Sequence, residues 1–145
     1  MNTPLKPPRL LDHLCFNLYS TSLKMTQLYK PLLAELHLTY PQYLVMLVLW
    51  EEEGLGIGDV ATRLEQDSGS VTPIVKRLEA QGYLVRNRDP KDERHRVLTL
   101  TDAGRKLREA GGRLNQQIAT SCNLQTGEMQ ALMAGLSKLA RNLDI

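Results

Sequence analysis

Hydroxyl and cationic side chains are concentrated between residues 68 and 101. That stretch holds seven Lys or Arg and four Asp or Glu, a net charge of +3, whereas the rest of the chain carries −1. If residues 68–80 are helical, their outer face and its flank carry no acid before Glu79. The residues that we expect to meet phosphates and base edges are Ser68, Ser70, Thr72, Pro73, Lys76 and Arg77, with Arg86 just beyond the helix.

A helix and a two-stranded hairpin must hold this surface. The helical spacing of four apolar residues predicts a buried stripe that ends before Gly82: Val71, Ile74, Val75 and Leu78. Two extended segments, from residue 83 and over 97–100, enclose a charged turn at 89–94 whose Asp-Pro pair favours a turn. Helix, strand, basic turn and strand are typical of a winged-helix DNA-binding protein, in which the helix enters the major groove and the turn the minor groove. The simpler alternative is an amphipathic helix and hairpin with a solvated basic face.

Upstream, the sequence predicts a core helix and the first half of a helix-turn-helix. Thr39 and Gln42 have the spacing of a capping box, with Pro41 in the first turn, and the apolar run 43–50 predicts a central core helix. We expect the acids at 51–53 to be solvated at its end. A further helix within 56–66 followed by a break at 67–69 completes the helix-turn-helix.

The remaining segments predict long helices that need a partner surface. Residues 1–8, with three prolines, are expected to be a flexible arm; a helical pattern begins at Arg9, and Pro31 predicts a kink or boundary. After the hairpin, helix restarts at Asp102, weakens at Gly111–Gly112 and ends near Cys122, and Thr126 is expected to cap a last helix. We therefore predict a mostly α fold with a small β wing: a winged-helix region at 37–101, and helices at 9–36 and 102–145 that form a homodimer.

Composition excludes several classes of protein. With 145 residues, 42% hydrophobic and 23% charged, the chain is expected to be globular and cytoplasmic, with neither a signal peptide nor a membrane span. Two cysteines are too few for a disulfide scaffold. His13, His37 and His95 have no zinc-ligand spacing with them, and no nucleotide or hydrolase motif occurs. We expect no metal, no cofactor and no enzymatic activity.

The hairpin and the segment after it resemble the MarR family of dimeric winged-helix repressors. The matching residues are Asp89-Pro90-Lys91-Asp92-Glu93-Arg94 and Leu100-Thr101-Asp102-Ala103-Gly104, and the resemblance covers about residues 10–143. It implies that Arg94 enters the minor groove of a near-palindromic operator and that Asp92 helps to hold it.

The N-terminal half is similar to the organic-hydroperoxide-sensing, OhrR-type branch of that family. The matching segments are 14–20, 29–33 and 38–43. The similarity implies that Cys15 is the peroxidatic sensor, that Tyr29 and Tyr40 of the other subunit donate to its thiolate with Tyr19 nearby, and that Cys122 is a possible resolving cysteine. A thiolate near such donors is a plausible peroxide nucleophile, and an apolar lining from Leu14, Phe16, Leu18 and Met25 would suit a lipid-like hydroperoxide.

We therefore predict a DNA-binding repressor that releases its operator when an organic hydroperoxide oxidises Cys15. Two alternatives stay open: a repressor released by a small aromatic ligand, with Cys15 silent, and a thiol peroxidase that turns over at Cys15. Without the resemblance, Cys15 would be an inert core cysteine and the tyrosines packing residues.

Overall fold

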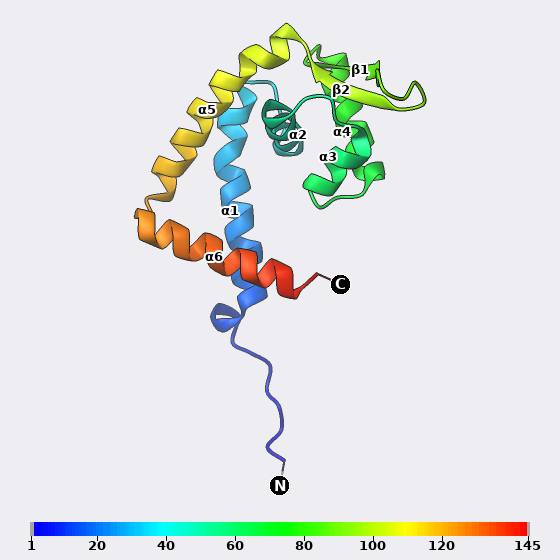
Figure 1. The fold of residues 1–145 in the computed structure, drawn as a ribbon. Helices are drawn as coiled ribbons and strands as arrows, with labels where there is room; N and C mark the ends of the chain where they lie inside the picture. The colour runs from blue at the N-terminus through cyan, green and yellow to red at the C-terminus, as the bar shows by residue number, and fades with distance from the viewer. Residues whose placement is uncertain (1, 145) are drawn as a thin grey trace. The chain divides into compact units, whose positions relative to one another are not determined.

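The computed structural model describes residues 2–144, as seven helical segments and a hairpin (Figure 1). In chain order these are a 3₁₀ turn η1 (Leu10–Asp12), α1 (Leu14–Ala34), α2 (Tyr40–Glu51), α3 (Ile57–Arg63), α4 (Ser68–Ala80), β1 (Leu84–Arg88), β2 (Arg96–Leu100), α5 (Asp102–Cys122) and α6 (Thr126–Asn142). The chain divides into two units, one up to Ala110 and one from Gly111. The mostly α fold with a small β wing is confirmed.

Helix α1 differs from its predicted bounds at both ends. The helix starts at Leu14 rather than Arg9, because the 3₁₀ turn comes first and His13 lies in an extended conformation. Pro31 does not end the helix, which continues to Ala34 with the proline inside it. Pro31 lies in the last turn of the helix. Proline has no backbone N–H, so one hydrogen bond is missing there, but few helical residues follow it and the helix continues to its end.

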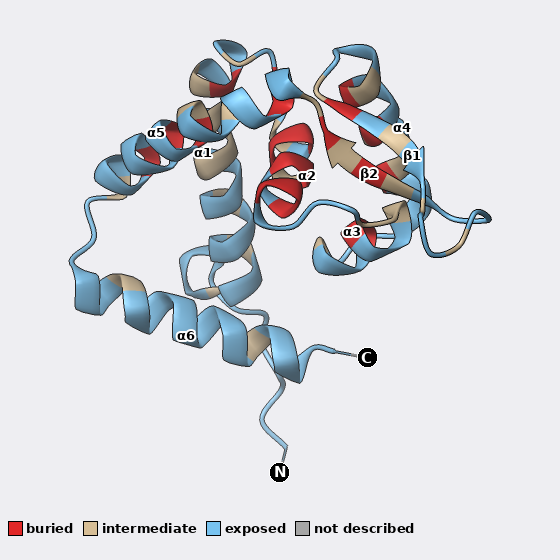
Figure 2. Ribbon diagram, turned by 45° about the horizontal axis from the view of Figure 1, so that its top comes forward, coloured by how far each residue is buried: buried red, intermediate tan, exposed pale blue. Residues whose placement is uncertain are grey.

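Helix α2 forms the centre of the first unit (Figure 2). Its start is the predicted capping box: Gln42 N donates to Thr39 Oγ1 at 3.3 Å, and Thr39 N donates to Gln42 Oε1 at 2.9 Å. Tyr43, Met46 and Leu49 are among its buried side chains, so the helix is covered on most of its circumference. This burial confirms the prediction of a core helix.

The acids at the end of α2 are exposed, as expected of a solvated helix end, but two of them also have charged partners. Glu52 forms an ion pair with Arg63 of α3. Glu53 accepts from Leu100 N at 2.7 Å and from Arg105 Nη2 at 3.1 Å, and the Arg105 hydrogen bond is the main cause of the lowered pKa of its carboxyl group. Glu53 thus joins the end of α2 to the end of β2 and the start of α5. Because these partners are distant from Glu53 in the sequence, no local sequence pattern could predict the contacts.

Helices α3 and α4 form the predicted helix-turn-helix. Val71, Val75 and Leu78 of α4 are buried, while Ile74 is half-buried at the edge of the stripe. At the C-terminus, Gly82 has φ +81°, and Tyr83 N donates to Leu78 O while Gly82 N donates to Glu79 O. This Schellman arrangement confirms that the glycine ends the helix.

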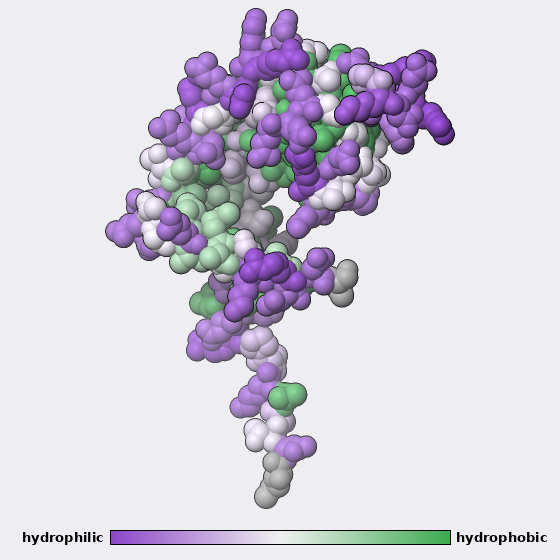
Figure 3. All heavy atoms as spheres, viewed as in Figure 1, coloured by the Kyte–Doolittle hydropathy of each residue, from purple (hydrophilic) through white to green (hydrophobic). Residues whose placement is uncertain are grey.

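The wing is an antiparallel hairpin, β1–β2, with Leu84 opposite Leu100 and Arg88 opposite Arg96. Strand β1 begins at Leu84 rather than Tyr83, and β2 begins at Arg96, closer to the charged turn than the predicted start at Val97. Leu55 pairs with Leu98, so the loop before α3 also bonds to β2. Leu84, Leu98 and Leu100 are buried, which anchors the base of the wing to the core. Figure 3 shows hydrophilic side chains covering its outer end.

A close approach of two backbone segments requires the glycine that follows the wing, Gly104. A Cβ built on it would lie 2.1 Å from the carbonyl oxygen of Tyr83, a separation that no side chain tolerates. The close approach is held by Trp50, whose Nε1 donates to Gly104 O at 2.9 Å, and by Thr101, whose Oγ1 accepts from Gly104 N at 3.1 Å. The first turn of α5 is therefore fixed against the end of α4 and the base of the wing.

Helix α5 begins in the first unit and continues through Gly111–Gly112 as one α-helix, without the predicted interruption; its end at Cys122 is as predicted. Helix α6 begins at Thr126, but its cap is Gln125, whose N–H donates to Glu128 Oε1 at 3.0 Å; the expected cap at Thr126 was one residue late. Helix α6 has no buried residue: Leu132, Met133 and Leu136 are exposed on it, as is Leu143 just after it.

Candidate DNA-binding surface and sensor cysteine

Two cations of the predicted DNA surface project from α4. Lys76 and Arg77 are exposed, as is Pro73, while Thr72 is half-buried. The hydroxyl of Thr72 donates to Ser68 O at 2.7 Å, a bond within its own helix. The next acid along α4 is Glu79, which is bonded to Arg86, so Lys76 and Arg77 are suited to bind phosphates.

The N-terminus of α4 is already capped by a carboxylate. Asp67 Oδ1 accepts from Ser70 N at 2.7 Å and Asp67 Oδ2 from Ser70 Oγ at 3.1 Å, and these bonds lower the pKa of Asp67. The sequence suggested that the Ser68-Gly69-Ser70 hydroxyls and N–H groups face phosphate. In the structure the N–H and the hydroxyl of Ser70 donate to Asp67 instead. Of the two predicted serines, Ser68 is therefore the more available to bind a phosphate.

Arg86 of β1 forms hydrogen bonds to α4, the second helix of the helix-turn-helix, which we call the recognition helix. Its Nη2 donates to Glu79 Oε1 at 3.1 Å and its Nε to Glu79 Oε2 at 3.4 Å, which lowers the pKa of Glu79. Only about a quarter of the Arg86 side chain is exposed. A direct DNA contact by Arg86 stays a prediction, but its present bonds fix β1 to α4.

The tip of the wing presents Arg94 to solvent. Its side chain is 92% exposed, and its Nε lies 3.8 Å from Asp92 Oδ1, which also accepts from Arg94 N at 3.1 Å. Asp89 accepts from Lys91 N at 2.9 Å and closes the first part of the turn. Two aspartates therefore shape the loop that displays the arginine, while the role of Asp92 in holding Arg94 for a minor groove stays a prediction.

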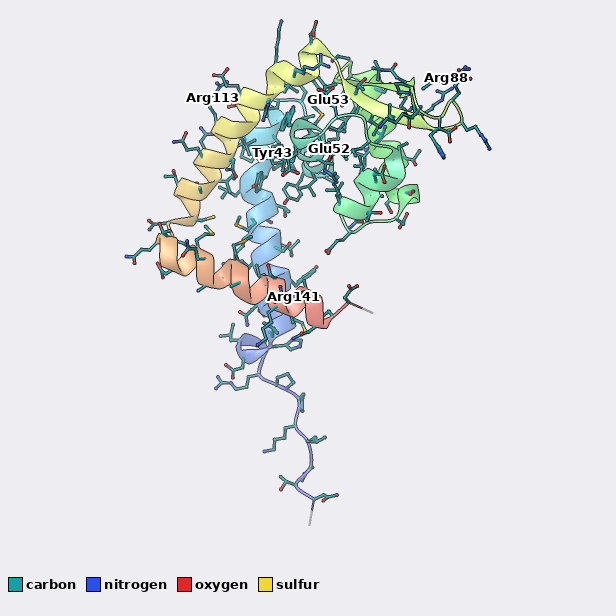
Figure 4. All side chains as sticks on the ribbon, viewed as in Figure 1. Tyr43, Glu52, Glu53, Arg88, Arg113 and Arg141 are labelled. Atoms are coloured by element: carbon teal, nitrogen blue, oxygen red, sulfur yellow. The ribbon has the colours of Figure 1, made fainter. Side chains whose placement is uncertain are left out.

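The sequence did not reveal a pair of arginines at the outer end of the hairpin. Arg88 and Arg96 are exposed and directly opposite in the register, so their side chains lie on the same face. Figure 4 shows Arg88 pointing away from the helices. Like charges in opposed positions destabilise a hairpin, and a bound anion relieves that cost. Only the strand register identifies this pair, which adds two candidate phosphate ligands.

Cys15 is an exposed free thiol in the first turn of α1. A sulfur anion there would lie at the positive end of the helix dipole. Leu11, Leu14 and Leu18 around it are exposed apolar residues. Tyr19, one turn further along, is 66% exposed, so it is available near the sulfur in the same chain.

The other two predicted tyrosines lie far from the cysteine of their own chain. Tyr29 is fourteen residues after Cys15 on a continuous helix, about 21 Å along its axis at 1.5 Å per residue. The rings of Tyr29 and Tyr40 are 5.0 Å apart, and both contact Tyr43. Burial, and then the nearby Tyr40, raise the pKa of Tyr43. If Tyr29 and Tyr40 donate to a Cys15 sulfur, that sulfur must belong to another chain.

Cys122 is a half-buried free thiol at the end of α5, in the second unit. Within residues 2–144, no group of three or more His, Cys, Asp or Glu side chains could hold a metal ion. In the same range, no helix is both long and apolar enough to span a bilayer.

The chain is similar to known transcriptional regulators. A family model described as transcriptional regulator SarA/Rot matches residues 27–110. The HTH-type transcriptional regulator TtmR of Methylorubrum extorquens is 42% identical over 137 residues, which cover 94% of this chain and 70% of TtmR. The organic hydroperoxide resistance transcriptional regulator of Bacillus subtilis is 48% identical over 101 residues, 70% of this chain and 69% of that protein.

Solved structures of AbfR are also similar. Reduced AbfR bound to DNA has a TM-score of 0.75 and 34% identity, covering 92% of this chain and 93% of AbfR. The disulfide form of AbfR has a TM-score of 0.66 and 35% identity, covering 92% and 89%.

Proposed function

This chain belongs to the MarR family of winged-helix transcriptional regulators, and from that premise we propose that it is a homodimeric repressor that releases its operator when an organic hydroperoxide oxidises Cys15. The observation that carries the proposal is the position of Cys15. It is exposed among apolar side chains and too far from Tyr29 of its own chain to be reached by it. A sensor that uses those tyrosines therefore requires two chains.

The exposed apolar residues support assembly into a dimer. Leu10, Leu11 and Leu14 are 57–76% exposed in the first unit. In the second unit, Leu132, Met133 and Leu136 of α6 are exposed apolar residues, as is Leu143 just after the helix. Burying such residues is worth roughly 25 cal/mol per Å² of apolar surface. Sedimentation of the reduced protein at micromolar concentration should give a dimer, and a monomer would contradict this arrangement.

DNA binding is proposed for α4 and the wing. Lys76 and Arg77 would contact a major groove, while Arg94 would enter the adjacent minor groove with Arg88 and Arg96 on phosphates. The relatives support this assignment, since reduced AbfR is seen bound to DNA. A two-fold dimer would place two α4 helices on half-sites about one helical turn apart in a near-palindromic operator.

The proposed sensing reaction is a two-electron oxidation of sulfur. The Cys15 thiolate attacks one peroxide oxygen, a sulfur–oxygen bond forms as the oxygen–oxygen bond breaks, and the alkoxide leaves and takes up a proton. The products are a cysteine sulfenic acid and an alcohol. The Cys122 thiol of the partner subunit would then displace the sulfenic oxygen as water and form an intersubunit disulfide. The disulfide form of AbfR supports the second step by analogy.

The deciding experiment separates the three candidate functions. The reduced protein first selects a duplex from a random library, and binding to it is then measured with and without cumene hydroperoxide for wild type, Cys15→Ser and Cys122→Ser. Wild type should lose the duplex, Cys15→Ser should bind it and ignore peroxide, and Cys122→Ser should still respond. Release of Cys15→Ser by peroxide would place the sensor elsewhere.

Two further readouts address the alternatives. Release of Cys15→Ser by small aromatic acids, with no peroxide response in wild type, would favour the ligand-released repressor. Steady peroxide consumption in the presence of a thiol reductant would favour the thiol peroxidase. The exposed cations of α4 and the wing argue against an enzyme, because turnover at Cys15 needs no basic recognition helix.

A further inference from the structure

A closed set of amide hydrogen bonds joins the turn before α2 to the end of α4. Gln42 is 4% exposed and is the one buried polar side chain in the part of the chain that the structure describes. Its Oε1 accepts from Thr39 N at 2.9 Å, and its Nε2 donates to Gln81 Oε1 at 2.7 Å. Gln81 Nε2 donates in turn to the carbonyl of His37 at 2.7 Å. The bonds begin and end on the same turn, residues 37–39.

This arrangement fixes the orientation of both amides. Turning either amide over would place an N–H against an N–H donor or an oxygen against a carbonyl. Gln42 is buried, so breaking its bond to Gln81 leaves a polar group without water to replace the partner. The turn and the two glutamines are therefore expected to move together. We call Gln42 and Gln81 the amide clasp.

The amide clasp lies between two sites that the proposed function must couple. Gln81 is the C-cap residue of the recognition helix α4. The turn at its other end contains His37 in a left-handed conformation, φ +56°, and leads directly into Tyr40. The Tyr40 ring packs on Tyr29 at 5.0 Å. A displacement of Tyr40 therefore acts on the residues that hold the end of α4.

We propose that Gln42 and Gln81 are positioning residues that transmit the state of the Tyr29–Tyr40 pair to the orientation of α4. The inference rests on the proposed function, because it assumes that oxidation of Cys15 changes the hydrogen bonding of these tyrosines. When the tyrosines lose a thiolate acceptor, the turn shifts, and the directional bonds of the clasp move the C-terminal end of α4. The two recognition helices of a dimer then lose their match to the half-sites.

Tyr83 provides a matched control. Its hydroxyl donates to Leu36 O at 3.4 Å, so it also links the end of α4 to the α1–α2 turn, but outside the amide clasp. Tyr83→Phe removes that bond and keeps the ring. It tests whether any contact with this turn suffices or whether the clasp itself carries the coupling.

The test compares operator affinity before and after peroxide treatment. Gln81→Met keeps the length of an exposed side chain and removes both of its amide bonds. If peroxide weakens wild-type binding about 100-fold, within the usual range of such coupling, we expect less than about 10-fold in Gln81→Met. Gln42→Met and the double variant should show the same loss as Gln81→Met, because the two side chains share one bond. Tyr83→Phe should keep the wild-type ratio.

The ratio of the two affinities distinguishes coupling from simple stabilisation. A purely structural clasp would weaken binding equally in both redox states and leave the ratio unchanged, which would overturn the inference. If wild type itself keeps the operator after peroxide, the proposed function and the coupling fail together. If wild type releases and Gln81→Met releases by the same factor, only the coupling fails. Gln81 is exposed, so this variant remains informative even if Gln42→Met does not fold.

Discussion

Gly104→Ala should destabilise the first unit by an amount that follows from its surroundings. The new methyl group would begin 2.1 Å from the carbonyl oxygen of Tyr83, so the first turn of α5 must move away by about 1 Å or more to reach ordinary contact. Overpacking of this kind costs about 1–3 kcal/mol. Weakening of the Trp50–Gly104 hydrogen bond adds about 1 kcal/mol, and the better helix propensity of alanine returns somewhat less than that.

The last two contributions nearly cancel, so the net loss is about 1–3 kcal/mol, or a decrease of roughly 3–10 °C in Tm for a chain of this size. Trp50 is the single tryptophan of the sequence and bonds to the residue being changed, so its fluorescence reports unfolding in urea. Protein concentration must be held constant, since dimerisation shifts the midpoint.

Gly112→Ala is the matched control in the same helix. A Cβ at Gly112 meets no atom within 4 Å, so this change should stabilise the protein by about 0.5–1 kcal/mol through helix propensity alone. A Gly104→Ala protein whose unfolding free energy lies within about 0.5 kcal/mol of wild type would refute the close-approach argument.

Arg96→Ala should relieve the like-charge opposition with Arg88, yet flatten the slope of log Kd against log salt by about one unit; an unchanged slope would remove Arg96 from the DNA surface. Glu53→Gln should lower stability at neutral pH, because a carboxyl with a lowered folded pKa stabilises above its unfolded pKa and stops doing so as pH falls through the folded one. The stability difference from wild type should close below about pH 4 in urea titrations, and a gap that persists there would contradict an ionic role. Cys122→Ser should give no intersubunit band on non-reducing gels after mild peroxide, while over-oxidation of Cys15 to sulfinic acid increases in mass spectra. An intersubunit band in that variant would exclude Cys122 as the resolving thiol.

Local features of the fold were predictable from the sequence. The capping box of Thr39 and Gln42 depends on residues three apart, and the buried stripe of α4 on helical spacing, so both were found in the predicted places. Pro31 was less informative, because a proline in the last turn of a helix is compatible with its continuation.

Features that depend on tertiary pairing could not be predicted. The bond from Leu100 N to Glu53 spans 47 residues, and the opposition of Arg88 and Arg96 depends on the hairpin register. The sequence also gave no reason to distinguish Arg86 from the other cations, although its bonds to Glu79 set it apart. Long-range acceptors decide which charged residues are available to a ligand.

The short hairpin also has a consequence for the abundance of the folded protein. A two-stranded sheet offers open edges to other chains, and exposed edges promote aggregation. The loop at Leu55 covers part of β2, while β1 carries the exposed Arg88. Charge on an edge strand repels a second copy of the same edge and keeps the wing from adding strands from neighbours. Replacing Arg88 by an uncharged β-former should therefore lower the yield of soluble protein in cells, apart from any effect on DNA binding.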